Sequence, residues 1–169
     1  MITYRKVTID DLELLTQARV EFFADIHKDM TDKQKAEIYT QKKAYFEETM
    51  TDGTFTAWLA FDENTLIATS GINFYKTPPN PKNPTGKTAY ISNMFTKPKY
   101  RGQGIATRLF TMTVEEAKNA VAVRLYCTRP IWDSLSMKNM GFSYQRVQWS
   151  FILIMKWREY NDRQRRKSA

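Results

Sequence analysis

The amino-acid sequence predicts an α/β fold in a single domain, and three observations lead to this prediction. Segments in which apolar and polar residues alternate, as in strands, are interspersed with segments whose apolar residues recur every three or four positions, as in helices. A length of 169 residues is typical of one domain. A hydrophobic content of 42% is typical of a chain that folds around a core. We expect residues 1–155 to form this domain and residues 156–169 to form a basic C-terminal tail.

The chain is predicted to begin with a strand and a helix. The strand covers Ile2–Val7. Thr8 is followed three residues later by Asp11, the spacing of a capping box that begins a helix. This helix is expected to bury one face, made of Leu12, Leu15, Phe22 and Ile26.

A second helix and two strands are predicted next. Thr31 with Gln34 indicates a helix start, and the helix runs to about Met50. Asp52 and Gly53 form a turn. The strand after this turn has apolar residues at alternate positions, namely Phe55, Ala57, Leu59 and Phe61.

The centre of the chain predicts a hairpin with a long loop, followed by a fourth strand. Residues 62–64 form a turn, and Thr65–Lys76 is the antiparallel partner of the preceding strand. Residues 77–86 contain four of the six prolines, so they are expected to form an irregular loop. The fourth strand covers Ala89–Thr96.

The remaining elements are a helix, a strand, a short helix and a final strand region. The third helix is expected to bury Ala106, Leu109, Phe110, Val114 and Ala117. The fifth strand alternates through Val121, Val123, Leu125 and Cys127. A short helix over residues 131–139 and a strand region ending at Met155 complete the domain.

Residues 100–106, Tyr-Arg-Gly-Gln-Gly-Ile-Ala, join the predicted fourth strand to the third helix. The first amides of a helix have no intrahelical acceptor, and the helix dipole adds partial positive charge there. Gly102 and Gly104 allow a ligand to approach the backbone, and Arg101 adds a cation. The stretch therefore predicts a pyrophosphate site. It is neither a Rossmann fingerprint, because Thr107 stands at the third glycine position, nor a P-loop, because Gly-Lys-Ser/Thr is absent.

Charge and cysteine content narrow the class of protein. The net charge is +8, and residues 156–169 contribute half of it, with six basic and two acidic residues. We expect this tail to be a solvated C-terminus, with RNA as the alternative partner. The single cysteine, Cys127, excludes an intrachain disulfide and predicts no metal cluster. We therefore expect a protein without a metal. No apolar run approaches the ~20 residues of a membrane span, so we also expect the protein to be cytoplasmic.

The pattern Arg-x-x-Gly-x-Ala, from Arg101 to Ala106, resembles the acyl-CoA pyrophosphate loop of the GNAT (GCN5-related) N-acetyltransferase superfamily. The run from Tyr90 to Gly102 resembles the fourth strand of that family, and Met140-Gly141-Phe142 resembles the Leu-Gly-Phe that ends its fourth helix. Residues 68–75 resemble a bacterial subgroup that acts on small amines or is unassigned.

This resemblance implies a mixed, mostly antiparallel twisted sheet flanked by helices, with the fourth and fifth strands splayed. The pantetheine arm of acetyl-CoA would lie in the gap, along the backbone of Met94, Phe95 and Thr96. For the side chains of Met94 and Phe95 we expect a packing role. The pyrophosphate would be held by Arg101 and by the backbone amides of Gly102, Gln103, Gly104, Ile105, Ala106 and Thr107.

The family's usual catalytic residues are missing from the sequence. Met137 occupies the position of the tyrosine that protonates the leaving thiolate, and Tyr90 occupies the position of a glutamate base. Replacement acids on the thiolate side are Tyr126, Ser134 and Ser136. Near the expected acceptor pocket, carboxylates that relay a proton or simply face solvent are Glu21 and Asp25. His27 is expected to act as a cation at a helix end, and Cys127 as a small core residue.

The sequence and the resemblance together predict an enzyme that transfers an acetyl group from acetyl-CoA to a primary amine of a small molecule or peptide. Two alternatives stay open. The protein is a catalytically weak acyl-CoA sensor, or its acceptor is RNA-linked or ribosomal and is recruited by the basic tail. We expect a monomer or a homodimer that does not act at a membrane.

Overall fold

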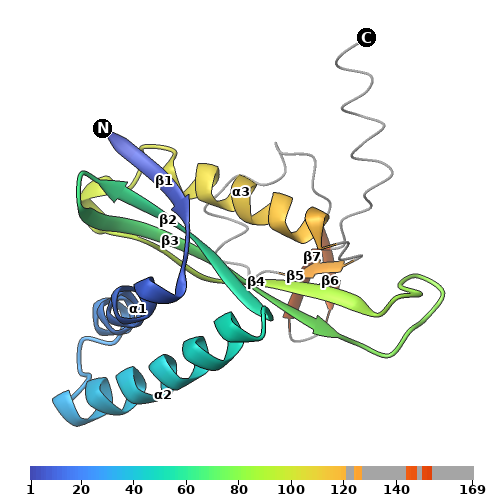
Figure 1. Ribbon diagram of the computed structural model, residues 1–169, viewed down its shortest axis with the longest axis horizontal. Helices are drawn as coiled ribbons and strands as arrows, with labels where there is room; N and C mark the ends of the chain where they lie inside the picture. Colours follow the sequence, from blue (N-terminus) through green and yellow to red (C-terminus); the bar gives the residue numbers. More distant parts are fainter. Residues whose placement is uncertain (121–123, 127–143, 148–149, 154–169) are drawn as a thin grey trace. The chain divides into compact units, whose positions relative to one another are not determined.

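The computed structural model describes residues 1–120, 124–126, 144–147 and 150–153. These residues form both strands and helices (Figure 1). The chain divides into two compact units. The first contains Met1–Gly71 and Asn93–Thr113, and the second contains Ile72–Ser92 and the described residues from Val114 onward.

The order of elements confirms the α/β prediction. In chain order the elements are β1 (Ile2–Lys6), a 3-10 turn (Ile9–Asp11), α1 (Leu12–Ile26), α2 (Asp32–Thr51), β2 (Phe55–Asp62), β3 (Thr65–Lys76), β4 (Lys87–Thr96), a second 3-10 turn (Pro98–Tyr100), α3 (Ile105–Asn119), β5 (Arg124–Tyr126), β6 (Tyr144–Val147) and β7 (Ser150–Leu153).

The strands form two sheets. The larger sheet has the order β1-β2-β3-β4-β5. β1 is antiparallel to β2, with Ile2 opposite Asp62. β4 is parallel to β5, and their pairing runs from Thr88 to Tyr90 on β4. β6 and β7 form a separate antiparallel pair. The larger sheet is therefore mixed, as predicted.

An ion pair between the exposed Arg5 and the buried Asp11 fixes the start of α1. The Asp11 carboxylate is buried and accepts a hydrogen bond from the backbone N–H of Thr8 at 2.8 Å, as the predicted capping box requires. It also accepts two hydrogen bonds from the Arg5 guanidinium, both 2.6 Å long. These bonds, with that of Arg5 contributing most, lower the pKa of Asp11. Thr8 begins a 3-10 turn that leads into the α-helix.

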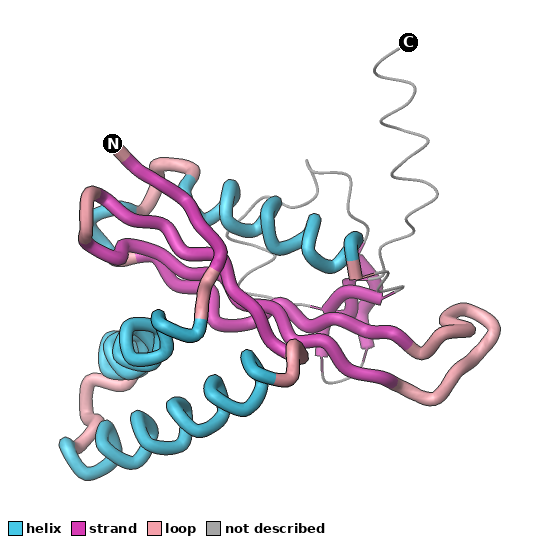
Figure 2. The backbone as a smooth tube through the Cα atoms, viewed as in Figure 1, coloured by secondary structure: helices cyan, strands magenta, loops and turns pink. Residues whose placement is uncertain are grey.

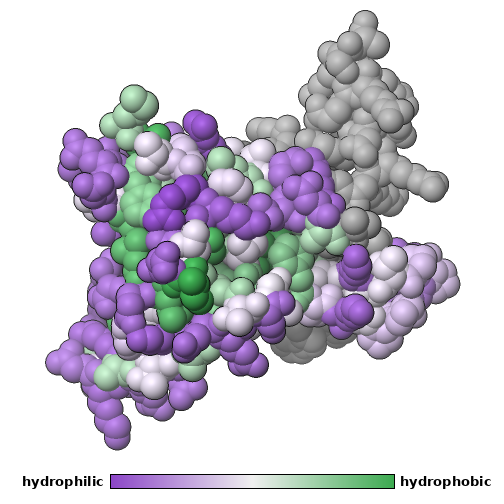
Figure 3. All heavy atoms as spheres, viewed as in Figure 1, coloured by the Kyte–Doolittle hydropathy of each residue, from purple (hydrophilic) through white to green (hydrophobic). Residues whose placement is uncertain are grey.

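The start of α2 is confirmed by the reciprocal bonds of its capping box. Thr31 accepts from the backbone N–H of Gln34 at 3.3 Å, and the Gln34 side chain accepts from the Thr31 N–H at 2.8 Å. Phe46 is the residue of this helix that is fully buried. The rest of its surface is largely hydrophilic (Figure 3).

Two apolar clusters form the core of the first unit, one on each face of its sheet. Alternate residues of β2 pack against α1 and α2, and this cluster contains Val7, Leu15, Ala18, Phe46, Phe55, Ala57, Leu59, Phe61 and Leu66. The intervening residues of β2 and β3 pack against the start of α3, in a cluster of Ala60, Ile67, Ala68, Ile105 and Leu109. Within this unit, α1 and α2 therefore cover one face of the sheet and α3 begins on the other (Figure 2).

In the second unit, the proline-rich loop over residues 77–86 is irregular, as predicted, but it is held by internal bonds. The side chain of Asn83 is fully buried and donates to the carbonyl of Lys87 at 3.1 Å. The backbone N–H of Thr77 donates to the carbonyl of Gly86 at 2.9 Å, which closes the loop.

Some sequence predictions need correction. Ile26 is 55% exposed rather than buried, because it is the last residue of α1 and lies beyond the part that packs on the core. Ala106 is half-buried. The last strand region consists of two strands, β6 and β7. Predictions that lie outside the described residues concern Val121, Val123, Cys127, the helix over 131–139, the pair at 141–142, and the tail over 156–169. None of the helices in the described segments is long and apolar enough to span a membrane.

Candidate active site

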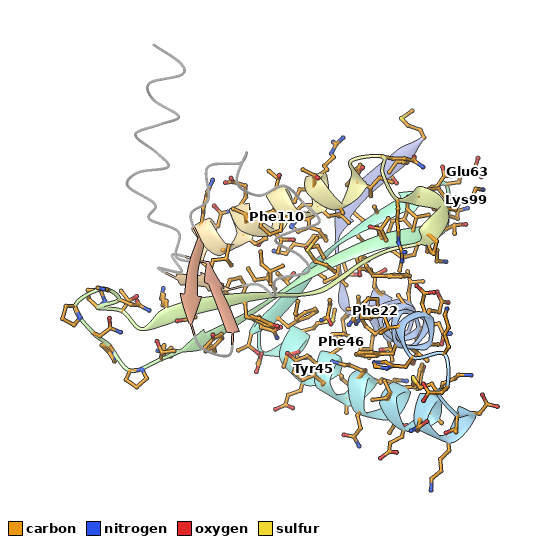
Figure 4. The ribbon with its side chains drawn as sticks, turned by 180° about the vertical axis from the view of Figure 1, so that it is seen from behind. Phe22, Tyr45, Phe46, Glu63, Lys99 and Phe110 are labelled. Atoms are coloured by element: carbon orange, nitrogen blue, oxygen red, sulfur yellow. The ribbon has the colours of Figure 1, made fainter. Side chains whose placement is uncertain are left out.

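The loop between β4 and α3 is anchored to the sheet of the first unit. At its start, the backbone N–H of Lys97 donates to the carbonyl of Ile67 at 2.9 Å. The hydroxyl of Tyr100 then donates to the Asp62 carboxylate at 3.1 Å, at the turn between β2 and β3. Figure 4 accordingly shows Lys99 and Glu63, from this loop and that turn, at the same end of the sheet. The loop is therefore held in place before any ligand binds.

Two glycines give the loop its shape and leave its backbone open. Gly102 and Gly104 have φ angles of 77° and 75°, a conformation that residues with a side chain rarely adopt. Both are exposed, and a Cβ placed on either would have no other atom within 4 Å. The backbone conformation therefore requires glycine at both positions, and space above the loop is available for a ligand.

The first turn of α3 presents backbone amides at the end of this loop. The N–H of Arg108 donates to the carbonyl of Gly104 at 3.0 Å, which begins the helical hydrogen bonds. The amides of Ile105, Ala106 and Thr107 therefore have no acceptor within the helix. Because the helix dipole is positive at this end, the amides can bind an anion.

Arg101 adds a positioned cation to the same loop. Its Nε donates to the carbonyl of Thr96 at 2.9 Å, and its Nη2 lies 3.4 Å from a carboxylate oxygen of Asp25. The side chain is 56% exposed, so its charge faces solvent. Gln103 is also exposed, and its side chain donates to the carbonyl of Lys99 at 3.3 Å.

Asp25 lies near the end of α1 and forms ion pairs with two cations, one of which is Arg101 of the loop. It pairs with Lys28 at 2.9 Å as well as with Arg101. These two cations, Lys28 above all, lower the pKa of Asp25. The structure thus places the Asp25 carboxylate beside Arg101, and whether Asp25 relays a proton, orients a charged group or simply faces solvent stays a prediction.

The end of β4 departs from regular strand geometry. Asn93 has a φ of 53°, and its carbonyl accepts a hydrogen bond from the buried Thr69 hydroxyl at 2.7 Å. A local break of this kind turns the neighbouring backbone groups away from the regular ladder. Met94 and Thr96 are half-buried, whereas Phe95 is buried and packs edge-on against Phe22, with ring centroids 5.5 Å apart.

A cavity of about 300 Å³ lies between α1, the first half of β3 and the end of β4. Glu21 is at its edge, with a carboxylate oxygen 3.8 Å from the Lys97 ammonium. The cavity lining also includes Gln17, Asn64, Thr69 and Phe95. Of the two predicted carboxylates, Glu21 lines this cavity.

The other catalytic candidates are only partly placed. Tyr90 is half-buried in β4 and pairs in register with Tyr126 of β5, so the structure brings the backbones of these two candidates together. Ser134, Ser136 and Met137 lie outside the described residues. His27 follows α1, is exposed, and stacks on Phe23 with ring centroids 6.5 Å apart.

Sequence reasoning missed two features of this region. The first is the positive φ of Asn93, for which the asparagine was a usable signal, because asparagine tolerates this conformation better than most residues. The second is Arg19, which is buried on α1. The helical pattern carried no signal for it, because a charged helix residue is normally exposed.

Comparisons with known proteins agree with this geometry. The model of the acetyltransferase (GNAT) family matches residues 20–132, which is more than half of the chain. A comparison with curated proteins gives no significant match. Among the described residues, no three side chains of His, Cys, Asp or Glu are grouped so that they could hold a metal ion.

Solved structures with the same fold include acetyltransferases that hold acetyl-CoA or coenzyme A. A predicted acetyltransferase with acetyl-CoA from Clostridium acetobutylicum is 30% identical, with a TM-score of 0.75, over 88% of this chain and 94% of that one. A GCN5-related N-acetyltransferase from Ralstonia eutropha JMP134 is 21% identical, with a TM-score of 0.72, over 88% and 96%. The PaiA N-acetyltransferase from Thermoplasma acidophilum, in complex with coenzyme A, is 18% identical, with a TM-score of 0.60, over 90% and 96%.

The open glycine loop, the helix N-terminus behind it and the match over residues 20–132 all point to one family. The chain therefore belongs to the acetyltransferase (GNAT) family and is an acyl-CoA-dependent N-acetyltransferase.

Proposed function

We propose that this enzyme transfers an acetyl group from acetyl-CoA to a primary amine of a small molecule or peptide. The observation that carries the proposal is the junction of β4 and α3, where exposed glycine backbone, three helix N-terminal amides and Arg101 converge. This arrangement suits the two negative charges of a pyrophosphate. The acetyl-CoA in the C. acetobutylicum structure and the coenzyme A in the T. acidophilum structure support this assignment.

In this proposal the pantetheine arm lies along β4. The pairing of β4 with β5 that the structure describes covers Thr88–Tyr90, and β4 continues to Thr96. In the proposal the pantetheine arm pairs as an extended ligand with the backbone of β4 beyond Tyr90. Such backbone contacts depend little on side-chain identity.

The thioester carbonyl would lie next to the break in β4 at Asn93. Because that break turns nearby amides out of the ladder, the amide of Met94 is suited to donate to the carbonyl oxygen as negative charge develops. The amine nitrogen attacks the carbonyl carbon, the C–N bond forms and the C–S bond breaks. Coenzyme A leaves as its thiolate, and the nitrogen loses a proton.

The proton is proposed to leave through water rather than directly to a side-chain base. Glu21 lines the cavity beside β4 and could accept the proton through such water. Proximity and an activated thioester provide much of the rate in this kind of transfer, so a strong base is not required.

The test is the release of free coenzyme A thiol from acetyl-CoA across a panel of primary amines, with the acetylated amine identified by mass spectrometry. The proposal predicts thiol and acetylamine in equal amounts with at least one amine. The catalytically weak sensor predicts binding of acetyl-CoA with no thiol release above the rate without enzyme. That result, for every amine tested, would refute the proposed activity.

A further inference from the structure

Arg19 on α1 is a buried cation, and two of its nitrogens lack a hydrogen-bonding partner among the described residues. Its side chain is only 5% exposed, and its Nε and Nη1 atoms are fully buried with no partner among the described residues. A buried charge that lacks a partner costs several kcal/mol, which is why buried charges are normally paired. The burial of the Arg19 guanidinium therefore needs a physical explanation.

The surroundings of Arg19 are aromatic and cationic. The guanidinium carbon lies 4.2 Å from the ring centroid of Phe22 and 5.0 Å from that of Phe23. On α2, the ammonium of Lys42 lies 5.3 Å from the ring centroid of Tyr45. Figure 4 shows Phe22, Tyr45 and Phe46 gathered where α1 and α2 meet the sheet of this unit.

No carboxylate offsets the two cations in the part of the chain that the structure describes. Burial lowers the pKa of Arg19 to about 10, so the group is still charged at neutral pH. Burial and, secondarily, the charge of Arg19 lower the pKa of Lys42. Stacking on aromatic rings offsets only part of the cost of burying the charge. An anion beside these two cations would offset the cost of their burial.

We propose that Arg19 and Lys42 form the recognition site for a carboxylate carried by the acceptor amine. This inference rests on the proposed acetyltransferase function and specifies its substrate class. Phe22 connects the two sites, because it stacks on Arg19 on one side and contacts Phe95 of β4 on the other. An acceptor whose carboxylate pairs with Arg19 thus has its body among aromatic rings, one residue away from the strand that we assign to the thioester.

The geometry of a guanidinium favours a carboxylate. Such a group accepts two parallel N–H bonds from one edge of the guanidinium, and each available edge includes Nε or Nη1, the two unpaired atoms of Arg19. Lys42 is half-buried and flexible, so it can move to admit the ligand and then add a third donor. The aromatic surroundings fit an apolar body, so the expected acceptors are amines with both a carboxylate and an apolar or aromatic group.

The experiment compares acceptors that differ only in the carboxylate. Acetylation of phenylalanine and of phenylalaninamide is measured with wild type, Arg19→Met and Lys42→Met. Wild type is expected to prefer the carboxylate in kcat/KM by about tenfold to hundredfold, the range for a hydrogen-bonded charge pair. Arg19→Met is expected to remove the preference while still acetylating the amide, and Lys42→Met to reduce it.

A matched control is Arg108→Met. Arg108 also stacks on an aromatic ring, 4.3 Å from the centroid of Tyr4, but it is exposed on α3. Its removal is expected to leave the carboxylate preference unchanged. Equal rates for phenylalanine and its amide in wild type, or a preference that survives Arg19→Met, would overturn the inference while leaving the acetyltransferase function intact.

A binding measurement tests the site without any acetyl transfer. The melting temperature is compared in 3-phenylpropionate and in 3-phenylpropionamide, neither of which has an amine to acetylate. The carboxylate alone is expected to stabilise wild type, by mass action, and to have no effect on Arg19→Met. Arg19→Lys, which keeps the charge without the planar edge, is expected to retain at most a small shift. Absence of a specific carboxylate effect on wild type would refute the site even if no amine were ever acetylated.

Discussion

The loop between β4 and α3 and the interface between α1 and α2 each hold an arginine, but in opposite situations. Arg101 in the loop is 56% exposed and bonded to Thr96 and Asp25. Arg19 in the interface is 5% exposed, and two of its nitrogens lack a partner among the described residues. The exposed arginine is paired and the buried one is not, which is the reverse of the usual distribution.

This contrast separates two ways of recognising a ligand. The loop relies mainly on backbone amides and on the conformations of Gly102 and Gly104, so it suits a donor that is common to a whole family. The interface relies on the side chains of Arg19 and Lys42, so it suits an acceptor that is particular to this protein. The following predictions test the contrast, from the largest expected effect to the smallest.

Gly104→Asp should have the largest effect. Aspartate cannot readily adopt a φ of 75°, and its charge would stand against the pyrophosphate. We expect acetyl-CoA affinity to fall by at least ~100-fold, so that a ligand concentration of 100 times the wild-type Kd, which stabilises wild type by ~2.7 kcal/mol, gives almost no rise in Tm.

The matched control for this change is Gly53→Asp. Gly53 has a φ of 76° and equally open surroundings, but it lies in the turn after α2. It carries the same backbone strain, so both variants should lose similar stability without ligand, and only Gly53→Asp should keep the shift with acetyl-CoA. Equal shifts in the two variants would mean that the loop does not bind the donor.

Asp11→Asn tests what a paired buried charge contributes on the same helix as Arg19. Asp11 bonds Arg5 twice and caps α1, so we expect a loss of ~2 kcal/mol in the free energy of unfolding. The exposed neighbour Asp10 is the control, and Asp10→Asn should change stability by no more than ~0.5 kcal/mol. Arg19→Met should be neutral or stabilising without ligand, because it removes an unpaired buried charge.

The Asp11 effect should depend on pH with a defined sign. Its pKa is lowered in the folded state, mainly by the Arg5 bonds, so the stabilisation is present above the unfolded pKa of ~3.9 and is lost as pH falls through the folded value. Denaturant unfolding should therefore show a constant difference between wild type and Asp11→Asn near neutral pH. A difference that grew below pH 4 would contradict the ion pair.

The helices, the strands and the loop between β4 and α3 could be predicted from the sequence because local residue patterns specify them. The capping box of Thr31 and Gln34, the turn at Asp52 and Gly53, and the glycines of the loop each act within a few residues, and each is found in the structure. The exposure of Ile26 and the burial of Arg19 depend instead on how α1 packs against its neighbours. Helical periodicity does not encode that packing, so the burial of Arg19 could not be predicted, whereas the position of Glu21 at a cavity was predicted.

Arg101→Ala should weaken acetyl-CoA binding about tenfold, because it removes one charged contact and leaves the amides in place. The effect should shrink at high salt, since the side chain is exposed. Arg19→Met should leave acetyl-CoA affinity unchanged. Isothermal titration of both variants checks this, and a larger loss in Arg19→Met than in Arg101→Ala would invert the assignment of donor and acceptor sites.

Asp25→Asn should have the smallest effect. It removes a negative charge beside Arg101, so acetyl-CoA should bind about twofold tighter at low salt, with no difference at high salt. Asp32→Asn is the control, because Asp32 pairs with Lys35 at 2.9 Å as Asp25 does with Lys28, but on α2. The same gain in both variants would reflect net charge alone.

The central claim, that backbone amides of the loop hold the donor, is tested most directly by NMR of the labelled protein during titration with acetyl-CoA. The amide signals of Gly102, Gln103, Gly104, Ile105, Ala106 and Thr107 are predicted to show the largest shifts and slowed hydrogen exchange at saturation. If the signals of other amides shift and these six stay unchanged, the claim that the loop amides hold acetyl-CoA is contradicted.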